Sequence, residues 1–212
     1  MMLSRLHYPV HNLGYGVRAG IWFQGCTVHC HGCVSRDTWP FDESRRIDLS
    51  TVMSWLEGLD GPLDGITISG GEPTDQPEAL LALVECLAPI RRDSDILLYS
   101  GKPVAALQHE VPWLWQHVDL LISDPFDANL AGSCALRGSS NQRVNRLSSL
   151  AWQRYPDETF EHTFGPQRQQ VSVHVDDHAV WMVGIPKPGD LRRLEGALTE
   201  RGISVRRTSW LT

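Results

Sequence analysis

Short apolar stretches alternate with segments of helical periodicity along the first 125 residues of the chain. The apolar stretches are rich in β-branched and aromatic residues, as strands are, and span 16–24, 65–73, 95–100 and 118–124. The segments between them place apolar residues three and four positions apart, which predicts helices at 48–59, 77–88 and 103–117. Strand alternating with helix is typical of a parallel sheet with right-handed crossovers, so we predict an α/β fold.

The remainder of the chain has a different pattern. Residues 138–168 are polar and weakly periodic, which predicts a loop with at most one short helix. After them come two strand-like stretches joined by a turn at Asp177-His178, a helix at 191–201 with Asp190 as its N-cap, and a last strand over 203–210. The expected organisation is therefore a core at 1–147, a loop or linker at 148–168 and a small β-β-α-β extension at 169–212.

Composition and charge exclude several classes of partner. The 212 residues are 42% hydrophobic and carry a formal net charge of −6, so we expect no nucleic-acid partner, because such proteins present a basic surface. The first residues lack the apolar segment of a secretory signal, and no apolar run is long enough to cross a membrane. We therefore expect a cytoplasmic protein without a membrane partner, in which clustered cysteines serve metal or redox chemistry rather than disulfides.

The segment GCTVHCHGC, at 25–33, concentrates the chemistry of the chain. It places Cys26, Cys30 and Cys33 in a C-x3-C-x2-C array, with His29 and His31 on either side of the second cysteine. One interpretation is a zinc site in which a histidine is the fourth ligand. The other is an iron–sulfur cluster with three thiolate ligands and one open iron. The spacing alone leaves both interpretations open.

Further polar features follow the predicted strands. In a parallel sheet, ligands bind at the carboxyl ends of the strands. The features at such ends are the cysteine loop, the tetrapeptide Gly70-Gly71-Glu72-Pro73, Ser100-Gly101 and Asp124-Pro125. The two glycines allow the backbone to come close to a ligand, Glu72 adds a carboxylate and Pro73 makes the exit of the turn rigid. We therefore expect one active site at this edge of the sheet.

The cysteine loop and the ISGGEP motif together resemble the radical S-adenosylmethionine (SAM) superfamily. The resemblance implies a partial (β/α) barrel and a single 4Fe–4S cluster held by Cys26, Cys30 and Cys33. It further implies that the amino and carboxylate groups of SAM bind the open iron while the Gly70–Pro73 turn holds the methionine amino group. One electron then cleaves SAM to methionine and a 5′-deoxyadenosyl radical, which takes hydrogen from a substrate.

Three further segments narrow this resemblance. GYGVRAGIWFQGC, CVSRDTW and LRGSSNQRV are similar to the activating proteins of anaerobic ribonucleotide reductases, over residues 7–147. The resemblance implies an oxidoreductase that generates a glycyl radical on a partner enzyme and draws electrons from a flavodoxin- or ferredoxin-like donor. It also implies that Ser100 and Asp124 line the SAM pocket. The 169–212 tail extends beyond the compact activase core.

Two alternatives to the activase remain. The first is a radical SAM enzyme that acts on a small molecule or a peptide, with the tail in place of the activase's partner surface. The second is a non-catalytic module that binds zinc or an iron–sulfur cluster and serves an interaction. Cluster content and SAM cleavage separate the second from the other two.

Overall fold

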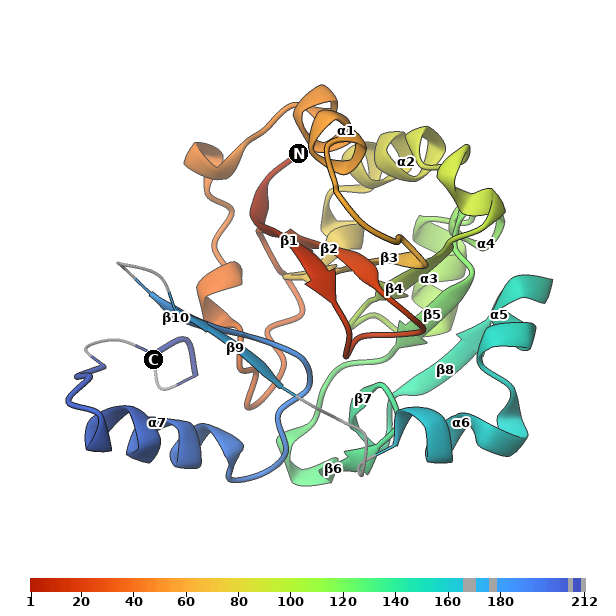
Figure 1. Ribbon diagram of the computed structural model, residues 1–212. Helices are drawn as coiled ribbons and strands as arrows, with labels where there is room; N and C mark the ends of the chain where they lie inside the picture. The colour runs from red at the N-terminus through yellow and green to blue at the C-terminus, as the bar shows by residue number, and fades with distance from the viewer. Residues whose placement is uncertain (166–170, 176–178, 206–207, 211–212) are drawn as a thin grey trace.

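A six-stranded sheet forms the centre of the protein (Figure 1). The computed structural model describes residues 1–165, 171–175, 179–205 and 208–210. The strands, in spatial order, are β1 (Leu3–Val10), β2 (Arg18–Phe23), β3 (Gly65–Gly70), β4 (Asp95–Tyr99), β5 (Leu120–Ser123) and β8 (Arg143–Arg146). The four strands β2 to β5 run parallel, and the edge strands β1 and β8 are antiparallel to their neighbours. The predicted α/β class with a mostly parallel sheet is therefore confirmed.

Helices cover one face of this sheet. They are α1 (Leu49–Glu57), α2 (Pro77–Cys86), α3 (Val104–Glu110) and α4 (Leu114–His117). Alternate strand residues such as Ile21, Ile68 and Leu98 pack against Val52 of α1 and Leu83 of α2 in the larger hydrophobic core. The expected helices are thus present, and α1 has Asp48 as its N-cap. Short 3-10 helices lie at Arg36–Thr38, Glu43–Arg45, Pro73–Asp75, Ile90–Arg92 and Ala128–Leu130.

The polar segment after residue 138 covers part of the opposite face. It contains two helices, α5 (Ser149–Arg154) and α6 (Asp157–Phe164), so the prediction of a loop with at most one short helix is wrong. Each helix buries only a narrow apolar stripe, with Tyr155 and Phe160 packed on Leu97 and Ile122 of the sheet. A small hairpin of β6 (Ala131–Cys134) and β7 (Arg137–Ser139) precedes them.

The C-terminal extension packs on the same face beside β1. Its hairpin consists of β9 (Ser172–Val175) and β10 (Val180–Val183), and the helix α7 spans Asp190–Glu200 with Gly189 as its N-cap (Figure 1). The expected turn at Asp177-His178 and residues 206–207 lie outside the described residues. In the described parts of 203–210 there is no strand, so the structure describes a β-β-α unit rather than β-β-α-β.

The N-terminal strand β1 was not predicted from the sequence. Polar Arg5 and His7 alternate with Leu6 and Tyr8 along it, because only the latter pair faces the helices. None of the helices in the described part of the chain is long and apolar enough to cross a membrane.

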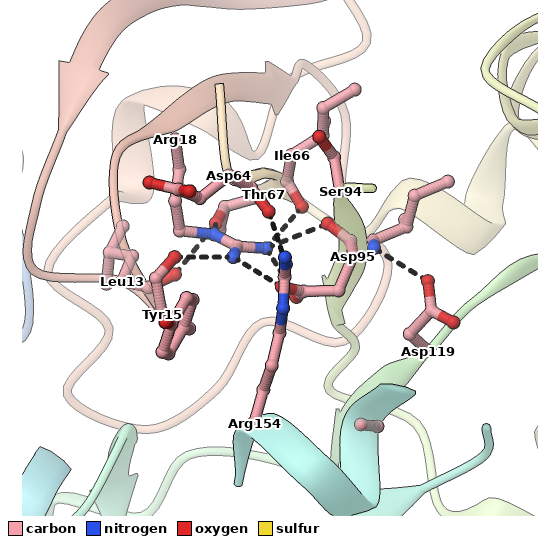
Figure 2. A network of polar contacts seen from close by, with 12 residues as sticks. Leu13, Tyr15, Arg18, Asp64, Ile66, Thr67, Ser94, Asp95, Asp119 and Arg154 are labelled. Carbon is pink, nitrogen blue, oxygen red and sulfur yellow. Dashed lines mark hydrogen bonds and ion pairs between the residues drawn. The ribbon is translucent and has the colours of Figure 1, made fainter. Parts of the chain in front are cut away.

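A buried polar network joins the starts of the parallel strands (Figure 2). Arg18, the first residue of β2, is fully buried, and its guanidinium makes two bonds to the Asp95 carboxylate of β4 at 3.1 and 2.9 Å. Its Nε donates to Thr67 Oγ1 of β3 at 2.7 Å. From the α5 side, Arg154 and the Tyr155 hydroxyl bond to the same carboxylate at 2.6 and 2.9 Å. This network ties strands β2, β3 and β4 to helix α5.

We expect Asp95→Asn to lower the free energy of unfolding by about 3–5 kcal/mol, because it leaves a buried guanidinium without its anion. Urea denaturation of the protein without cofactors measures this change. Glu43→Gln is the matched control, since the Glu43–Arg46 pair is exposed and its loss should leave the denaturation midpoint unchanged. Equal midpoints for the two variants would contradict the prediction.

Candidate functional site

The four predicted features lie at one edge of the sheet. The cysteine loop follows β2, the Gly70–Pro73 turn ends β3, Ser100 follows β4 and Asp124 follows β5. These four strands are parallel neighbours in that order, so their carboxyl ends are adjacent. The expectation of one shared site at this edge agrees with this arrangement.

Backbone hydrogen bonds close the cysteine loop at its base. Gly25 N–H donates to Thr38 O at 2.7 Å and Cys26 N–H donates to Trp39 O at 3.0 Å. Ser35 N–H donates to Cys33 Sγ at 3.4 Å. Backbone hydrogen bonds from His29 and Val28 at Cys26, and from Phe126 at Cys30, partly offset the burial that raises the pKa of these two thiols. Such N–H···S bonds favour thiolates and bound iron, so the loop fits an iron–sulfur cluster.

Metal binding must remove the protons from the thiols of the cysteine loop. Burial raises the pKa of Cys26, and it raises the pKa of Cys30 to about 11. The neighbouring Cys33 and Cys26 thiols add to the rise in the pKa of Cys30. Binding of iron therefore has to displace protons from buried thiols.

The zinc interpretation finds no support in this loop. Within the described residues, no three histidine, cysteine, aspartate or glutamate side chains are placed to hold one metal ion. A four-iron cluster binds its cysteines through different irons, so its ligands need not converge on a single point. His29 instead stacks on Trp39 with ring centroids 4.4 Å apart, and His31 is exposed.

The Gly70–Pro73 turn is docked directly on the cysteine loop. Glu72 N–H donates to Gly25 O at 2.9 Å and Gly71 N–H donates to Phe23 O at 2.8 Å. A Cβ at position 71 would lie 2.1 Å from Gly25 O, so only glycine permits this approach. Gly70 has a φ of +110°, which also favours glycine. The two motifs, about 45 residues apart in sequence, thus form one structural unit.

The Glu72 carboxylate joins the ends of two strands. It is 1% exposed and accepts hydrogen bonds from the Thr74 hydroxyl at 2.7 Å, the Ser100 hydroxyl at 2.9 Å and Gly101 N–H at 2.7 Å. Burial raises its pKa, and these donors oppose the increase. The carboxylate therefore fixes the loop after β4 relative to the turn after β3.

Ser100 and Asp124 are likewise engaged by the chain. The Ser100 hydroxyl bonds to Glu72, as above, and the side chain is 3% exposed. Asp124 has a φ of +79°, and its carboxylate accepts from Arg143 at 2.8 and 3.0 Å and from the Ser123 hydroxyl at 2.9 Å. The hydrogen bond from Arg143 lowers the pKa of Asp124, which keeps the carboxylate ionised within this ion pair.

Sequence reasoning missed two residues that brace the site. The Asp75 carboxylate accepts from Thr27 N–H at 2.6 Å, inside the cysteine loop. It also pairs with Lys102 Nζ at 3.0 Å, and Lys102 N–H donates to Ser100 Oγ at 3.1 Å. The position of Asp75, two residues after the Gly70–Pro73 turn, was the only sequence signal for this role. These contacts link the cysteine loop to the loops after β3 and β4.

We expect Gly71→Ala to separate the turn from the cysteine loop, because its Cβ meets backbone atoms that cannot move aside. The variant should unfold at a urea concentration well below that of the wild type and bind iron poorly on reconstitution. Gly196→Ala is the matched control, since nothing lies within 4 Å of its added Cβ in helix α7. That control should gain about 0.5–1 kcal/mol in stability. Normal iron binding by Gly71→Ala would contradict the docking argument.

Comparison with known proteins gives a consistent family. Residues 12–145 match the family model described as a 4Fe-4S single cluster domain. The anaerobic ribonucleoside-triphosphate reductase-activating protein of Vibrio cholerae is 28% identical over 149 residues, which are 67% of this chain and 96% of that protein. The corresponding protein of enterobacteria phage T4 is 27% identical, over 66% of this chain and 90% of its own.

A second group of relatives carries a different name. The pyruvate formate-lyase-activating enzyme of Streptococcus mutans is 36% identical over 67% of this chain and 55% of its own length. The solved structure of QueE from Escherichia coli covers 47% of this chain and 52% of its own, with 19% identity and a TM-score of 0.39, too low to bear on the fold. Since the family model spans more than half of the chain, this protein belongs to the 4Fe-4S single cluster domain family, and the resemblance to radical SAM enzymes is confirmed.

Proposed function

We propose that this radical SAM enzyme is an activase that generates a glycyl radical on a partner enzyme. The observation that carries the proposal is the docking of the Gly70–Pro73 turn on the cysteine loop through Glu72 N–H and Gly25 O. It brings a cluster-binding loop and a glycine turn open to close approach together at the carboxyl ends of parallel strands. The names of the relatives support the activase role.

In this proposal Cys26, Cys30 and Cys33 hold the 4Fe–4S cluster. The Ser35 N–H that donates to Cys33 Sγ at 3.4 Å and the docking of the loop on the Gly70–Pro73 turn support the assignment. The three thiolates would leave one iron open to SAM, and with one external electron the bound cluster and SAM would supply the abstraction of a hydrogen atom from the glycine Cα, with methionine and 5′-deoxyadenosine as the products.

The chain's own part is to position SAM and exclude water. Backbone of the Gly70–Pro73 turn receives the methionine end, because neither glycine has a Cβ to keep the ligand away. Ser100 and Asp124 line the pocket at the ends of β4 and β5. Asp124 stays ionised, since the hydrogen bond from Arg143 lowers its pKa, and the ion pair holds the carboxylate at the end of β5.

The sheet then corresponds to a partial (β/α) barrel. Its two edges are β1 and β8, and the domain divides into a core at 1–147, a connecting segment at 148–168 and an extension at 169–212. The partner is a glycyl-radical enzyme and the electron donor is flavodoxin- or ferredoxin-like. The cytoplasm suits this chemistry, because thiols stay reduced there.

One observation favours the alternative of a small-molecule or peptide substrate. The Vibrio relative is matched over 96% of its length by 67% of this chain, and the family match ends at residue 145. The extension therefore adds material to the compact activase, on the face of the sheet where Val183 and Ile185 pack against Trp22 and Tyr99. The extension therefore changes which molecules can reach the face of the sheet opposite helices α1 to α4.

We expect Cys30→Ala to abolish cluster formation and SAM cleavage together, since one thiolate ligand is lost. Iron and sulfide analysis after anaerobic reconstitution and release of 5′-deoxyadenosine measure the two. Cys86→Ala is the matched control, because Cys86 is exposed on α2 and away from the loop. The control should keep about four irons per chain. SAM cleavage by Cys30→Ala at the wild-type rate would refute the ligand assignment.

An assay with a glycyl-radical enzyme distinguishes the activase from the enzyme with a small-molecule or peptide substrate. With reduced protein, SAM and a glycyl-radical enzyme of the reductase or lyase type, we expect an electron paramagnetic resonance doublet on the partner. Formation of 5′-deoxyadenosine in proportion to that signal supports the activase. Cleavage of SAM without any glycyl signal favours a small-molecule or peptide substrate, and absence of both iron and cleavage favours a non-catalytic module.

A further inference from the structure

The end of the chain returns to the cysteine loop. Arg36 N–H donates to Ser209 O at 3.2 Å, and the Ser209 hydroxyl donates to Val34 O at 2.6 Å. Val34 and Arg36 follow Cys33 within three residues, so Ser209 holds the exit of the loop from two sides. These bonds join positions about 175 residues apart in sequence.

The bond to Val34 O acts on a peptide unit that also faces the cluster loop. The carbonyl of Val34 and the N–H of Ser35 belong to the same planar peptide group. Ser35 N–H donates to Cys33 Sγ at 3.4 Å, while the Ser209 hydroxyl donates to the carbonyl oxygen at the opposite edge of the same peptide group. A donor on the carbonyl fixes the rotation of the plane and polarises its N–H, which strengthens the bond to sulfur.

Hydrogen bonds from Thr38, within the same segment, hold the peptide group after Ser35. The Thr38 hydroxyl and Thr38 N–H donate to Ser35 O at 2.7 and 3.1 Å. The peptide groups before and after Ser35 are therefore both held, and the first of them depends on a residue outside the family-matched region.

Ser209 itself is supported by the C-terminal extension. The indole N–H of Trp210 donates to Glu195 Oε1 of α7 at 3.2 Å. The β9–β10 hairpin is attached to the core through Asn12, whose amide donates to Val183 O at 2.7 Å, and through Arg5, which lies 4.0 Å over the Trp181 ring. The extension thus has a defined position from which its last residues reach the loop.

We propose that Ser209 is a positioning residue for the iron–sulfur site, which orients the Ser35 N–H onto Cys33 Sγ and thereby sets the reduction potential of the cluster. The proposal rests on the proposed function only in taking Cys33 as a cluster ligand. Hydrogen bonds to cluster sulfurs stabilise the more negative, reduced state, so they raise the potential.

The test compares Ser209→Ala with Ser209→Thr, which retains the hydroxyl, and with Ser54→Ala, an exposed serine on α1. Two readouts are taken on full-length protein. The first is hydrogen exchange of the amides of residues 35–36 in protein without iron. The second is the midpoint potential of the reconstituted cluster without SAM, measured from its electron paramagnetic resonance signal during a redox titration.

We expect Ser209→Ala to speed exchange at residues 35–36 about five-fold, the effect of one lost hydrogen bond, and to shift the midpoint potential to a more negative value. Ser209→Thr and Ser54→Ala should match the wild type in both readouts. Faster exchange with an unchanged potential, or unchanged exchange, overturns the proposal. A wild-type protein that binds no cluster overturns the proposed function instead, and the exchange readout, taken without iron, still reports whether Ser209 holds the loop.

Discussion

The buried ion pair between Arg18 and Asp95 is the constraint on which the rest of the sheet depends. A guanidinium and a carboxylate without solvent are costly unless every donor and acceptor is satisfied. Here Thr67 and Arg154 (Figure 2), together with the Tyr155 hydroxyl, complete the network and hold the starts of β2, β3 and β4 in register. The register fixed at this end of the strands also determines where their carboxyl ends lie.

At those carboxyl ends a second buried carboxylate, that of Glu72, also joins neighbouring strands, through neutral donors rather than through an arginine. Glu72 is satisfied by hydroxyl and backbone N–H donors of the loops after β3 and β4, and burial raises its pKa. Its backbone N–H meanwhile binds Gly25 O of the cysteine loop. Buried carboxylates thus join the strands at both ends, and the carboxyl ends add the cysteine loop and Asp124, which is why we propose the chemistry there.

Local patterns predicted the parts of this structure whose causes are local. The parallel strands and their helices depend on residues close in sequence, and those predictions agree with the structure. The partner of Arg18 could not be predicted, because Asp95 lies 77 residues away in sequence. Strand β1 was missed since the face that it turns away from helices α1 to α4 carries polar Arg5 and His7, and α5 and α6 were missed because each buries only a narrow stripe.

The same reasoning explains why the extension is not a separate appendage. The family match ends at residue 145, yet Asn12 holds the β10 strand beside one end of β1, and Ser209 bonds to the segment that leaves the cysteine loop. A unit attached at both places cannot shift without changing one of them. Movement of the extension therefore changes the hydrogen bonds on Val34 and Arg36, and through the shared peptide plane it changes the N–H group that faces Cys33 Sγ.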